Sequence, residues 1–543
     1  MTLAVWTSGR GTTSNGPRSK LIGVPADVAA TPEAASDGRW LFAALFFAIV
    51  VAGNAALLSW FAWRPVVRPV LTLFLFVAAF AAHFMSVYGV VIDSAMVANV
   101  LQTDLRETRD LLNARLLLTV LVVAVLPSTW LWTLRLARQG WLREAAWAGA
   151  GGLAAIALLA ALFFAFSAEL SATMRNHRAL RFMINPLNTV WAVGVNAYEH
   201  GRVHGGPPLP IGRDARLAPA SPPPLLVFVV GETARADHFS LNGYGRDTNP
   251  ELAQRDVLSF SAVTSCGTST AASLPCMFSA LGRADFEARR QDQENLLDLL
   301  QHAGMAVLWI DNQSGCKGVC DRVPAAQASV LPAKAAPLPA GWCRADGECY
   351  DEALLHGLDE RLAALDPARR ARGVAIFLHQ MGSHGPAYAA RSPVARKRFA
   401  PECATNVLQD CGPQELVNAF DDSIAYTDHV LARTIDWLQT KRRAYATGLL
   451  YVSDHGESLG ENHLYLHGMP WAVAPDAQKH VPLVLWLSAE LQRGRGIDLA
   501  CLRARRDLPA SHDALFSTVL GLVGVSAAEY RAERDLSAPC RAP

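Results

Sequence analysis

The sequence predicts a bundle of membrane-spanning α-helices followed by a soluble α/β domain. Hydrophobic residues make up 51% of the 543 residues and the mean hydropathy is +0.17, with the apolar excess concentrated in the N-terminal third. Farther along, continuous apolar runs have the length of buried parallel strands, and polar or charged side chains follow them. All ten cysteines lie after residue 260, which sets the later part of the chain apart.

Four segments are long enough to cross a bilayer, which requires about 20 apolar residues. They are residues 41–63, 69–91, 116–134 and 146–168. The connections after the first and third segments carry Arg64, Arg68, Arg135, Arg138 and Arg143. Because basic connections stay in the cytoplasm, this topology places everything after the fourth span on the outer side.

The remaining N-terminal segments are assigned by composition. Residues 1–40 are polar and predict a disordered tail on the outer side. A helix is expected near residues 93–112, between the second and third spans, where Asn99, Thr103 and Glu107 recur at i, i+4 and i+8 and share one face. On the residues alone, that face is most simply a solvated one. Residues 169–224 predict membrane-surface helices and a Pro-rich linker, and the soluble domain covers residues 225–543.

Charge and cysteine content narrow the class of protein. The chain has 49 Lys plus Arg against 48 Asp plus Glu, a balance that argues against nucleic acid as its main partner. An even number of cysteines confined to one region indicates a disulfide framework in an oxidising compartment, whereas a zinc ribbon is disfavoured because no C-x2-C pair occurs. We expect local pairing: Cys266/Cys276, Cys316/Cys320, Cys343/Cys349 and Cys403/Cys411, with Cys501/Cys540 as the more distant pair.

Three apolar runs carry metal-ligating side chains to one edge of the predicted sheet. LLVFVV is followed by Gly and Glu232, LLYVS by Asp454 and His455, and VAIFL by His379 and then His384. The carboxyl ends of parallel strands are where α/β sheets place ligand-binding groups. A strand-end salt bridge or a packed histidine would explain each residue alone. The repetition favours a site for zinc or another transition metal.

The stretch SCGTSTAASLPC, from Ser265 to Cys276, contains five hydroxyl side chains at the expected start of a helix. Such a hydroxyl is commonly an N-cap, and a helix amino terminus is also a phosphate site. Beside a metal ion, a coordinated hydroxyl can ionise at neutral pH without a neighbouring histidine base. The residues alone leave open which of the five would act.

Five separated motifs together resemble the phosphoethanolamine transferases of Gram-negative bacteria, which include the lipid A phosphoethanolamine transferases and the mobile colistin-resistance enzymes. They are VVGETARADHFSLNGYGRDTNP, SCGTSTAASLPCMFS, DNQSGCKGVCDR, HQMGSHGPAY and SDHGESLGENHLYLHG, and YGVVIDSAMVANVLQTDLRET extends the likeness into the membrane part. The resemblance implies an α/β/α sandwich of the alkaline phosphatase/sulfatase superfamily, in the periplasm and anchored in the bacterial inner membrane.

The resemblance also implies roles for individual residues. Zinc would be held by Glu232, Thr270, Asp454 and His455, with Thr270 as the nucleophile. His384 and His467 would hold a second zinc ion or assist proton transfer. Contacts to substrate are expected from Asn99, Thr103, Glu107 and Lys317, and from Thr268, Ser269 and Glu457. One zinc ion is expected to bind tightly, and the number at work stays open.

The implied reaction moves phosphoethanolamine from phosphatidylethanolamine to a lipid A phosphate through a phosphothreonine intermediate, in a monomeric enzyme. It would lower the negative charge of the surface and favour polymyxin resistance. Alternatives are another acceptor (core heptose, a periplasmic glucan or a protein) or a phosphodiesterase or sulfatase-like hydrolase. The sulfatase motif C/S-x-P-x-R is absent around Thr270, which argues against the hydrolase. A membrane scaffold with a degenerate domain is disfavoured because every metal-ligand position is filled.

One departure from the family concerns the N-terminus. The family typically has five spans, and residues 1–40 contain no candidate for the first of them. Either the helix is absent and the N-terminus lies outside, or the assigned start is misplaced. The zinc site is unaffected by the choice.

Overall fold

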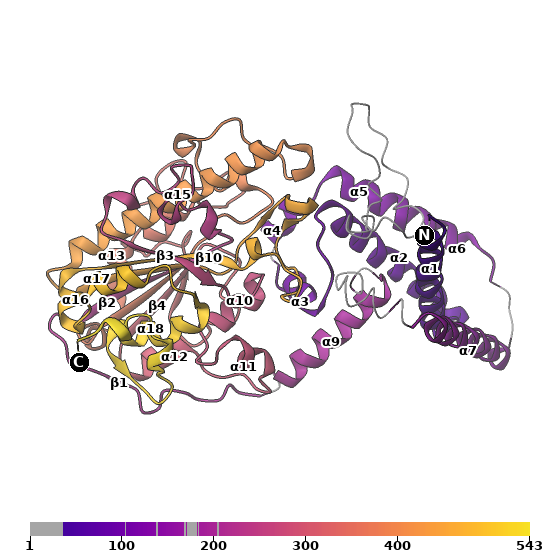
Figure 1. Ribbon diagram of the computed structural model, residues 1–543, viewed down its shortest axis with the longest axis horizontal. Coiled ribbons are helices and arrows are strands. Elements are labelled where there is room, and N and C mark those ends of the chain that lie inside the picture. Colours follow the sequence, from indigo (N-terminus) through magenta and orange to yellow (C-terminus); the bar gives the residue numbers. More distant parts are fainter. Residues whose placement is uncertain are drawn as a thin grey trace. The chain divides into compact units, whose positions relative to one another are not determined.

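The computed structural model describes residues 36–103, 105–136, 140–167, 170, 182, 184–203 and 206–542 (Figure 1). Its contacts divide the chain into two units. One consists of Met1–Asp93 with Ala114–Gly194, and the other of Ser94–Asn113 with Val195–Pro543. The segment near residues 93–112 therefore belongs to the same unit as the soluble domain. Most of the predicted N-terminal tail, residues 1–35, lies outside the described residues.

The first unit consists of apolar helices. They are α1 (Ser36–Ser59), α2 (Arg64–Val87), α5 (Ala114–Val120), the π-helical turn η3 (Leu121–Val125), α6 (Leu126–Thr133) and α7 (Trp141–Ala165), and α9 (Leu187–Val203) begins in this unit. Three helical stretches are long and apolar enough to cross a membrane: Arg64–Val87, Ala114–Thr133 and Trp141–Ala165. They correspond to the second, third and fourth predicted spans.

The first predicted span differs from the structure at its end. Residues 41–63 were expected to be one helix, but α1 ends at Ser59 and α2 already begins at Arg64. Pro65, in the first turn of α2, favours a new helix start over a continued one. The apolar stretch Ala44–Ser59 is shorter than the three helices above. A fourth crossing therefore remains a prediction.

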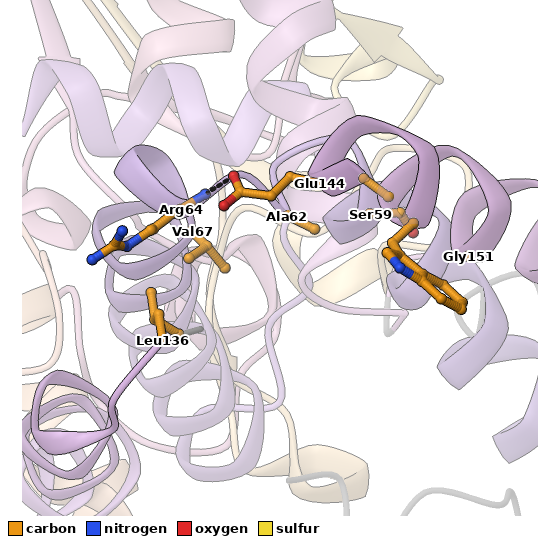
Figure 2. Close-up of a pocket in the computed structure, with 9 residues that line it drawn as sticks. Ser59, Ala62, Arg64, Val67, Leu136, Glu144 and Gly151 are labelled. Carbon is orange, nitrogen blue, oxygen red and sulfur yellow. Dashed lines mark hydrogen bonds between the residues drawn. The ribbon is translucent and has the colours of Figure 1, made fainter. Parts of the chain in front are cut away.

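A cavity of about 490 Å³ lies among the ends of α1, α2 and α7 (Figure 2). Its lining is Ser59, Ala62, Arg64, Val67, Leu136, Glu144, Trp147, Ala148 and Gly151. The backbone N–H of Arg64 donates to the Glu144 carboxylate at 3.3 Å, which satisfies one free N–H group at the amino terminus of α2. These lining residues include no cluster of metal-ligating side chains.

The second unit is built on an eight-stranded sheet with the strand order β11-β3-β10-β7-β2-β6-β4-β5. The strands are β2 (Pro224–Gly231), β3 (Leu258–Thr264), β4 (Ala306–Asp311), β5 (Ala325–Gln327), β6 (Val374–His379), β7 (Ala446–Ser453), β10 (His480–Leu487) and β11 (Ala510–Ser511). The three apolar runs of the sequence form the adjacent parallel strands β7, β2 and β6. The sheet is mixed, because β10 is antiparallel to both neighbours.

Helices cover both faces of this sheet (Figure 1). Alternate residues of β2 belong to different cores: Leu226, Phe228 and Val230 pack in one, and Leu225, Val227 and Val229 in the other. The first core includes α12 (Leu296–His302) and α18 (Leu515–Val523), and the second includes α15 (Pro413–Lys441). The strands are buried on both faces, as their unbroken apolar sequences predicted. This arrangement confirms the expected α/β/α sandwich.

The other helices of the second unit are α3 (Ser94–Gln102), α4 (Leu105–Leu111), α10 (Thr270–Met277), α11 (Arg283–Ala288), α13 (Leu358–Ala364), α14 (Pro367–Arg370), α16 (Ala489–Arg495) and α17 (Leu499–Arg505). Two small sheets pair β1 (Arg216–Leu217) with β12 (Val525–Ser526), and β8 (Ser458–Leu459) with β9 (Tyr465–Leu466). The end of the segment expected to be a linker thus pairs with the domain through β1.

The ten cysteines form five disulfides in the pairing expected from the sequence. They join Cys266 to Cys276, Cys316 to Cys320, Cys343 to Cys349, Cys403 to Cys411 and Cys501 to Cys540. Four of the five join cysteines that are 4 to 10 residues apart, so each of these four disulfides restrains only a short loop.

Candidate active site

Glu232, Asp454 and His455 meet at the carboxyl edge of the sheet. The register of β2 and β7 pairs Gly231 with Ser453, so the next residue of each strand leaves the sheet at the same level. Glycine is required at 231, because a Cβ atom there would lie 2.5 Å from the Tyr451 ring. All three functional side chains are fully buried.

Their ligand atoms converge on one point, lying within 4.8 Å of one another. His455 Nε2 is 3.4 Å from Glu232 Oε1 and 3.3 Å from Asp454 Oδ2. The other ring nitrogen, Nδ1, lies 2.9 Å from the Gly456 carbonyl and so must donate, which leaves Nε2 to act as a ligand. Asp454 Oδ1 accepts two backbone N–H groups, whereas Oδ2 has no hydrogen-bond partner in the described part of the chain.

The electrostatics of this cluster favour a positive charge at its centre. Burial, with the charge of Glu232, raises the pKa of Asp454 to about 6. Burial opposes a charged imidazole, yet Asp454 and Glu232 raise the pKa of His455 to about 10. Burial also opposes ionisation of Glu232, but His455 holds the pKa of that carboxyl below its usual range. Two buried carboxylates, one of which has an oxygen that accepts no hydrogen bond, and an imidazole therefore fit a divalent cation such as zinc.

Thr270 is the first residue of α10 and the hydroxyl that reaches this cluster. Its Oγ1 lies 3.1 and 3.3 Å from the two carboxylate oxygens of Glu232 and 3.3 Å from His455 Nε2. The preceding loop is tightly packed, since a Cβ atom at Gly267 would lie 2.8 Å from the Ser273 nitrogen. The structure thus brings together the four residues that the resemblance named.

Three of the other four hydroxyls in the stretch are engaged with the main chain. Ser265 Oγ donates to the Gly267 carbonyl, Thr268 Oγ1 donates to Met469 O at 2.7 Å, and Ser273 Oγ donates to Asp454 O at 2.5 Å. Ser269 precedes α10 and makes no side-chain cap to it. The substrate contacts expected of Thr268 and Ser269 stay predictions.

His467, His384 and Glu457 lie around the same cluster. The ring centroids of His455 and His467 are 4.2 Å apart, and those of His467 and His384 are 5.8 Å apart. His467 Nδ1 is 3.4 Å from Glu457 Oε2. Burial raises the pKa of Glu457 to about 8, so this carboxyl holds a proton at neutral pH. The group is suited to a second cation or to proton transfer.

His379 does not join the metal ligands. It ends β6 as expected, but its Nδ1 lies 3.1 Å from Asp311 Oδ2, and both side chains are buried. His379 is therefore a histidine packed in the core, paired with Asp311, the carboxylate that ends the neighbouring strand β4.

The expected helix near residues 93–112 is broken in two. Helix α3 ends at Gln102 and α4 begins at Leu105, so Asn99 and Glu107 do not share one continuous helical face. Thr103 Oγ1 donates back to Asn99 O at 2.9 Å, and Lys317 Nζ donates to Gln102 O at 3.1 Å. Both contacts cap the end of α3. The side chain of Glu107 lies outside the described residues.

This pair of helices is attached to the catalytic unit through Asp110. Its Oδ2 is 2.7 Å from Arg391 Nη2, and its carbonyl accepts from Asn406 Nδ2 at 2.9 Å. Arg391 is almost fully buried and also donates from Nε to the carbonyl of His384 at 2.7 Å. One arginine therefore connects the predicted headgroup segment to a histidine beside the cluster.

Gln313, which was not expected from the sequence, contacts the candidate metal ligand Glu232 directly. Gln313 Nε2 donates to Glu232 Oε2 at 3.1 Å, and the Thr233 hydroxyl donates to Glu232 Oε1 at 2.6 Å. Gln313 follows the end of β4 by two residues. The rule that located Glu232 and Asp454, polar residues after an apolar run, could have found it.

Comparison with known proteins identifies the family of the chain. A family model for sulfatases matches residues 224–525, and a model for phosphoethanolamine transferases EptA and EptB matches residues 50–200. Phosphoethanolamine transferase EptA of Salmonella typhimurium is 41% identical over 501 residues, which cover 91% of this chain and 89% of that protein. Phosphatidylethanolamine transferase Mcr-1 of Escherichia coli is 41% identical over 494 residues, or 89% of this chain and 88% of that one.

A solved structure shows the same similarity in three dimensions. The integral membrane protein lipooligosaccharide phosphoethanolamine transferase A (EptA) from Neisseria meningitidis superimposes with a TM-score of 0.86 at 33% identity, covering 95% of both chains. The expected sulfatase-like fold is confirmed. The chain is therefore an enzyme of the phosphoethanolamine transferase family to which EptA and Mcr-1 belong.

Proposed function

We propose that this enzyme transfers phosphoethanolamine from phosphatidylethanolamine to a lipid A phosphate, with Thr270 as the nucleophile. The position of Thr270 Oγ1, 3.1 Å from Glu232 and 3.3 Å from His455, carries the proposal. The name of Mcr-1 gives phosphatidylethanolamine as its substrate, and the neisserial relative is a lipooligosaccharide transferase. Lipid A is the phosphorylated lipid portion of such molecules.

Glu232, Asp454 and His455 would hold a zinc ion together with Thr270. Bound zinc lowers the pKa of a coordinated hydroxyl and withdraws charge from phosphoryl oxygens. The residues around it supply orientation: the backbone N–H groups of Thr233 and His455 fix Asp454, and Gln313 fixes Glu232. Phosphoryl transfer depends mainly on such positioning and charge stabilisation, so no strong base is required.

The reaction consists of two exchanges at one phosphorus atom. Thr270 Oγ1 attacks the phosphorus of phosphatidylethanolamine, its bond to the glycerol oxygen breaks, and that oxygen leaves as diacylglycerol with the proton lost by Thr270. An oxygen of the lipid A phosphate then attacks the phosphothreonine, and Thr270 leaves and recovers a proton. His384, His467 and Glu457 would shuttle these protons, unless the histidines hold a second zinc ion. Two half-reactions at one nucleophile give ping-pong kinetics.

Substrate would be held between the catalytic residues and the segment attached through Asp110. Asn99, Thr103 and Glu107 would hold the ethanolamine headgroup, and Lys317 would contact phosphate. Thr268 and Ser269 are further candidate contacts in the loop before α10. The catalytic unit would lie in the periplasm, because disulfides persist in oxidising compartments, and the membrane unit in the inner membrane. Attaching an amine to a lipid A phosphate would lower the negative charge of the bacterial surface and favour polymyxin resistance.

Mass spectrometry of lipid A from a host expressing the chain tests the nucleophile and the acceptor together. We expect lipid A bearing phosphoethanolamine with the wild type, none with Thr270→Ala, and a reduced amount with Thr270→Ser, which keeps the hydroxyl. Persistent modification by Thr270→Ala would refute the nucleophile. Release of diacylglycerol with unmodified lipid A would refute the acceptor.

Metal removal tests the zinc assignment. Dialysis of the full chain against a chelator is expected to abolish diacylglycerol release, and added Zn²⁺ should restore it where Mg²⁺ does not, because the imidazole ligand disfavours magnesium. Asp454→Asn should lower zinc affinity by at least 10-fold, which is roughly the loss when metal-site groups are perturbed. Full activity in the chelated protein would rule out a metal-dependent reaction.

A further inference from the structure

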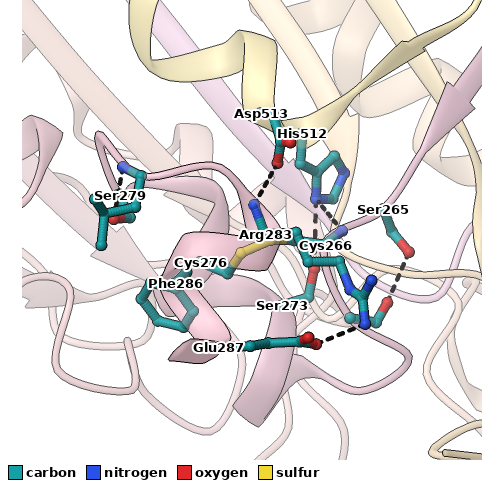
Figure 3. Close-up of a disulfide and its surroundings, with 12 residues drawn as sticks. Ser265, Cys266, Ser273, Cys276, Ser279, Arg283, Phe286, Glu287, His512 and Asp513 are labelled. Carbon is teal, nitrogen blue, oxygen red and sulfur yellow. Dashed lines mark hydrogen bonds and ion pairs between the residues drawn. A yellow bond between two sulfur atoms is a disulfide. The ribbon is translucent and has the colours of Figure 1, made fainter. Parts of the chain in front are cut away.

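His512 lies directly behind the Thr270 loop, although it comes from the far C-terminal part of the chain. It opens the short helix η14 (His512–Ala514), which follows the edge strand β11. Its side chain is buried at 1% exposure. In Figure 3, dashed lines join one nitrogen of the ring to Ser273 of α10 and to the main chain of Cys266.

Both ring nitrogens of His512 bond to main-chain atoms. The Cys266 N–H donates to Nδ1 at 3.0 Å, and Nε2 lies 3.0 Å from the Ser453 carbonyl. An amide N–H can only donate and a carbonyl can only accept. Nδ1 therefore carries no proton and Nε2 carries one, so the partners select a single neutral tautomer.

These two bonds connect the two halves of the active site. Cys266 begins the loop that leads to Thr270, and Ser453 is the last residue of β7, directly before Asp454. Ser273, one turn after Thr270, adds a second tie through its bond to Asp454 O at 2.5 Å. The segment that carries Thr270 and the strand that leads to Asp454 and His455 are thus joined by hydrogen bonds between side chains and main-chain atoms.

The same short helix also contacts the start of α11, the helix that follows α10. Asp513 Oδ1 accepts from the Arg283 N–H at 2.8 Å, at the start of α11. The Cys266–Cys276 disulfide closes the segment between these two anchor points. His512 and Asp513 together therefore bracket the nucleophile helix.

We propose that His512 is a positioning residue for phosphoryl transfer: it sets the place of Thr270 relative to Asp454 and His455. The inference rests on the proposed function of Thr270. His512 touches neither the ligand atoms nor the reacting hydroxyl, so it acts through the backbone of Cys266 and Ser453 and through the Ser273 hydroxyl, which lies 3.4 Å from Nδ1. A displacement of about 1 Å at a reacting group can cost on the order of 100-fold in rate.

A buried histidine with only a structural role provides the matched control. His429 on α15 is also buried, with Nδ1 2.8 Å from Glu251 and Nε2 3.1 Å from Glu352. These partners lie outside the Thr270 loop and the β7 end. His429→Gln should lower stability without a specific effect on the chemical step.

The test uses the full chain in detergent with short-chain phosphatidylethanolamine as donor. Four quantities are measured for each variant: kcat, KM, zinc affinity by chelator competition, and the thermal unfolding midpoint. His512→Leu removes both ring bonds. His512→Asn can keep the acceptor near Nδ1, and His512→Gln can keep the donor near Nε2.

We expect His512→Leu to lower kcat at saturating Zn²⁺ by about 30- to 100-fold, within the range for groups that orient an active site, with KM unchanged. His512→Asn and His512→Gln should each restore part of kcat, and His429→Gln should match the wild-type kcat at temperatures where it is folded. Three results would overturn the inference: wild-type kcat in folded His512→Leu, a loss of kcat that disappears once Zn²⁺ is saturating, or an equal loss in His429→Gln. A wild-type chain that releases no diacylglycerol would instead refute the proposed function.

Discussion

Gly382 lies beside the candidate active site, and this position requires a glycine for two separate reasons. Its φ is +52°, in the left-handed region, and a Cβ atom would lie 2.7 Å from the Glu232 carbonyl oxygen and 2.9 Å from the Glu232 nitrogen. Its own N–H donates to buried Asp351 at 2.9 Å, so it cannot move away without losing that bond. The backbone of Glu232, a proposed metal ligand, therefore lies directly against this position.

Gly382→Ala is expected to displace Glu232 and to lower zinc affinity by about 10-fold or more. Gly341→Ala is the control, because its φ is +84° but a Cβ atom there would meet nothing within 4 Å. Both variants incur the left-handed strain of about 1 kcal/mol or more. Only Gly382→Ala should lose zinc in chelator titrations. Equal zinc affinity in the two variants would show that the contact with Glu232 is unimportant.

At the scale of elements, helix α15 is anchored by a histidine between two carboxylates. His429 bonds to Glu251 and Glu352 through its two nitrogens, which requires both nitrogens to be protonated. Burial opposes this charge, but the hydrogen bonds to Glu352 and Glu251 outweigh it and raise the pKa of His429. Burial likewise opposes ionisation of Glu352, yet His429 lowers the pKa of that carboxyl.

The raised pKa of His429 predicts a pH-dependent stability. A histidine whose folded-state pKa exceeds 6.5 contributes its stability fully below pH 6.5 and loses it as pH rises through the folded value. A tenfold tighter binding of the proton in the folded state corresponds to about 1.4 kcal/mol. We expect the thermal midpoint of the wild type to fall as pH rises above 6.5, and His429→Gln to be less stable at low pH with a flatter profile. An unchanged slope in the variant would assign the effect to other groups.

At the scale of the whole molecule, the disulfides differ in the length of chain they restrain. Cys501 and Cys540 are 39 residues apart and tie α17 to the C-terminal end of the chain, whereas Cys316 and Cys320 are only 4 apart. In the loop-entropy account, the first closes a much larger loop in the unfolded chain and so contributes about 4 kcal/mol against about 2 kcal/mol for the second.

Removing each disulfide as a double Cys→Ala variant should reveal this difference. Guanidinium unfolding of the full chain in detergent measures the loss of unfolding free energy. We expect a loss about twice as large for the Cys501–Cys540 pair as for the Cys316–Cys320 pair, in the ratio of their loop entropies. Similar losses would mean that local packing, not loop closure, sets the value of these bonds.

Several features were readable from the order of residues. Short continuous apolar runs such as LLVFVV, each followed by polar residues, are typical of strands buried on both faces, so the sheet and the edge that carries Glu232 and Asp454 followed. The short spacings of eight cysteines made local pairing the simplest one. Thr270 was a different case: its neighbours in SCGTSTAASLPC offer the same chemistry, and the family likeness, not the spacing, selected it.

The remaining features depend on contacts between distant parts of the chain. A break in the helix after Gln102, the pairing of His379 with Asp311 and the contact of Gln313 with Glu232 all arise where separate strands or loops meet. His512 is the clearest example, since its two main-chain partners are Ser453, the last residue of β7, and Cys266, which follows the end of β3. Local preference governs which segments become strands and helices. Side-chain partners at a sheet edge are chosen by how the strands are ordered, and that order is a property of the folded core.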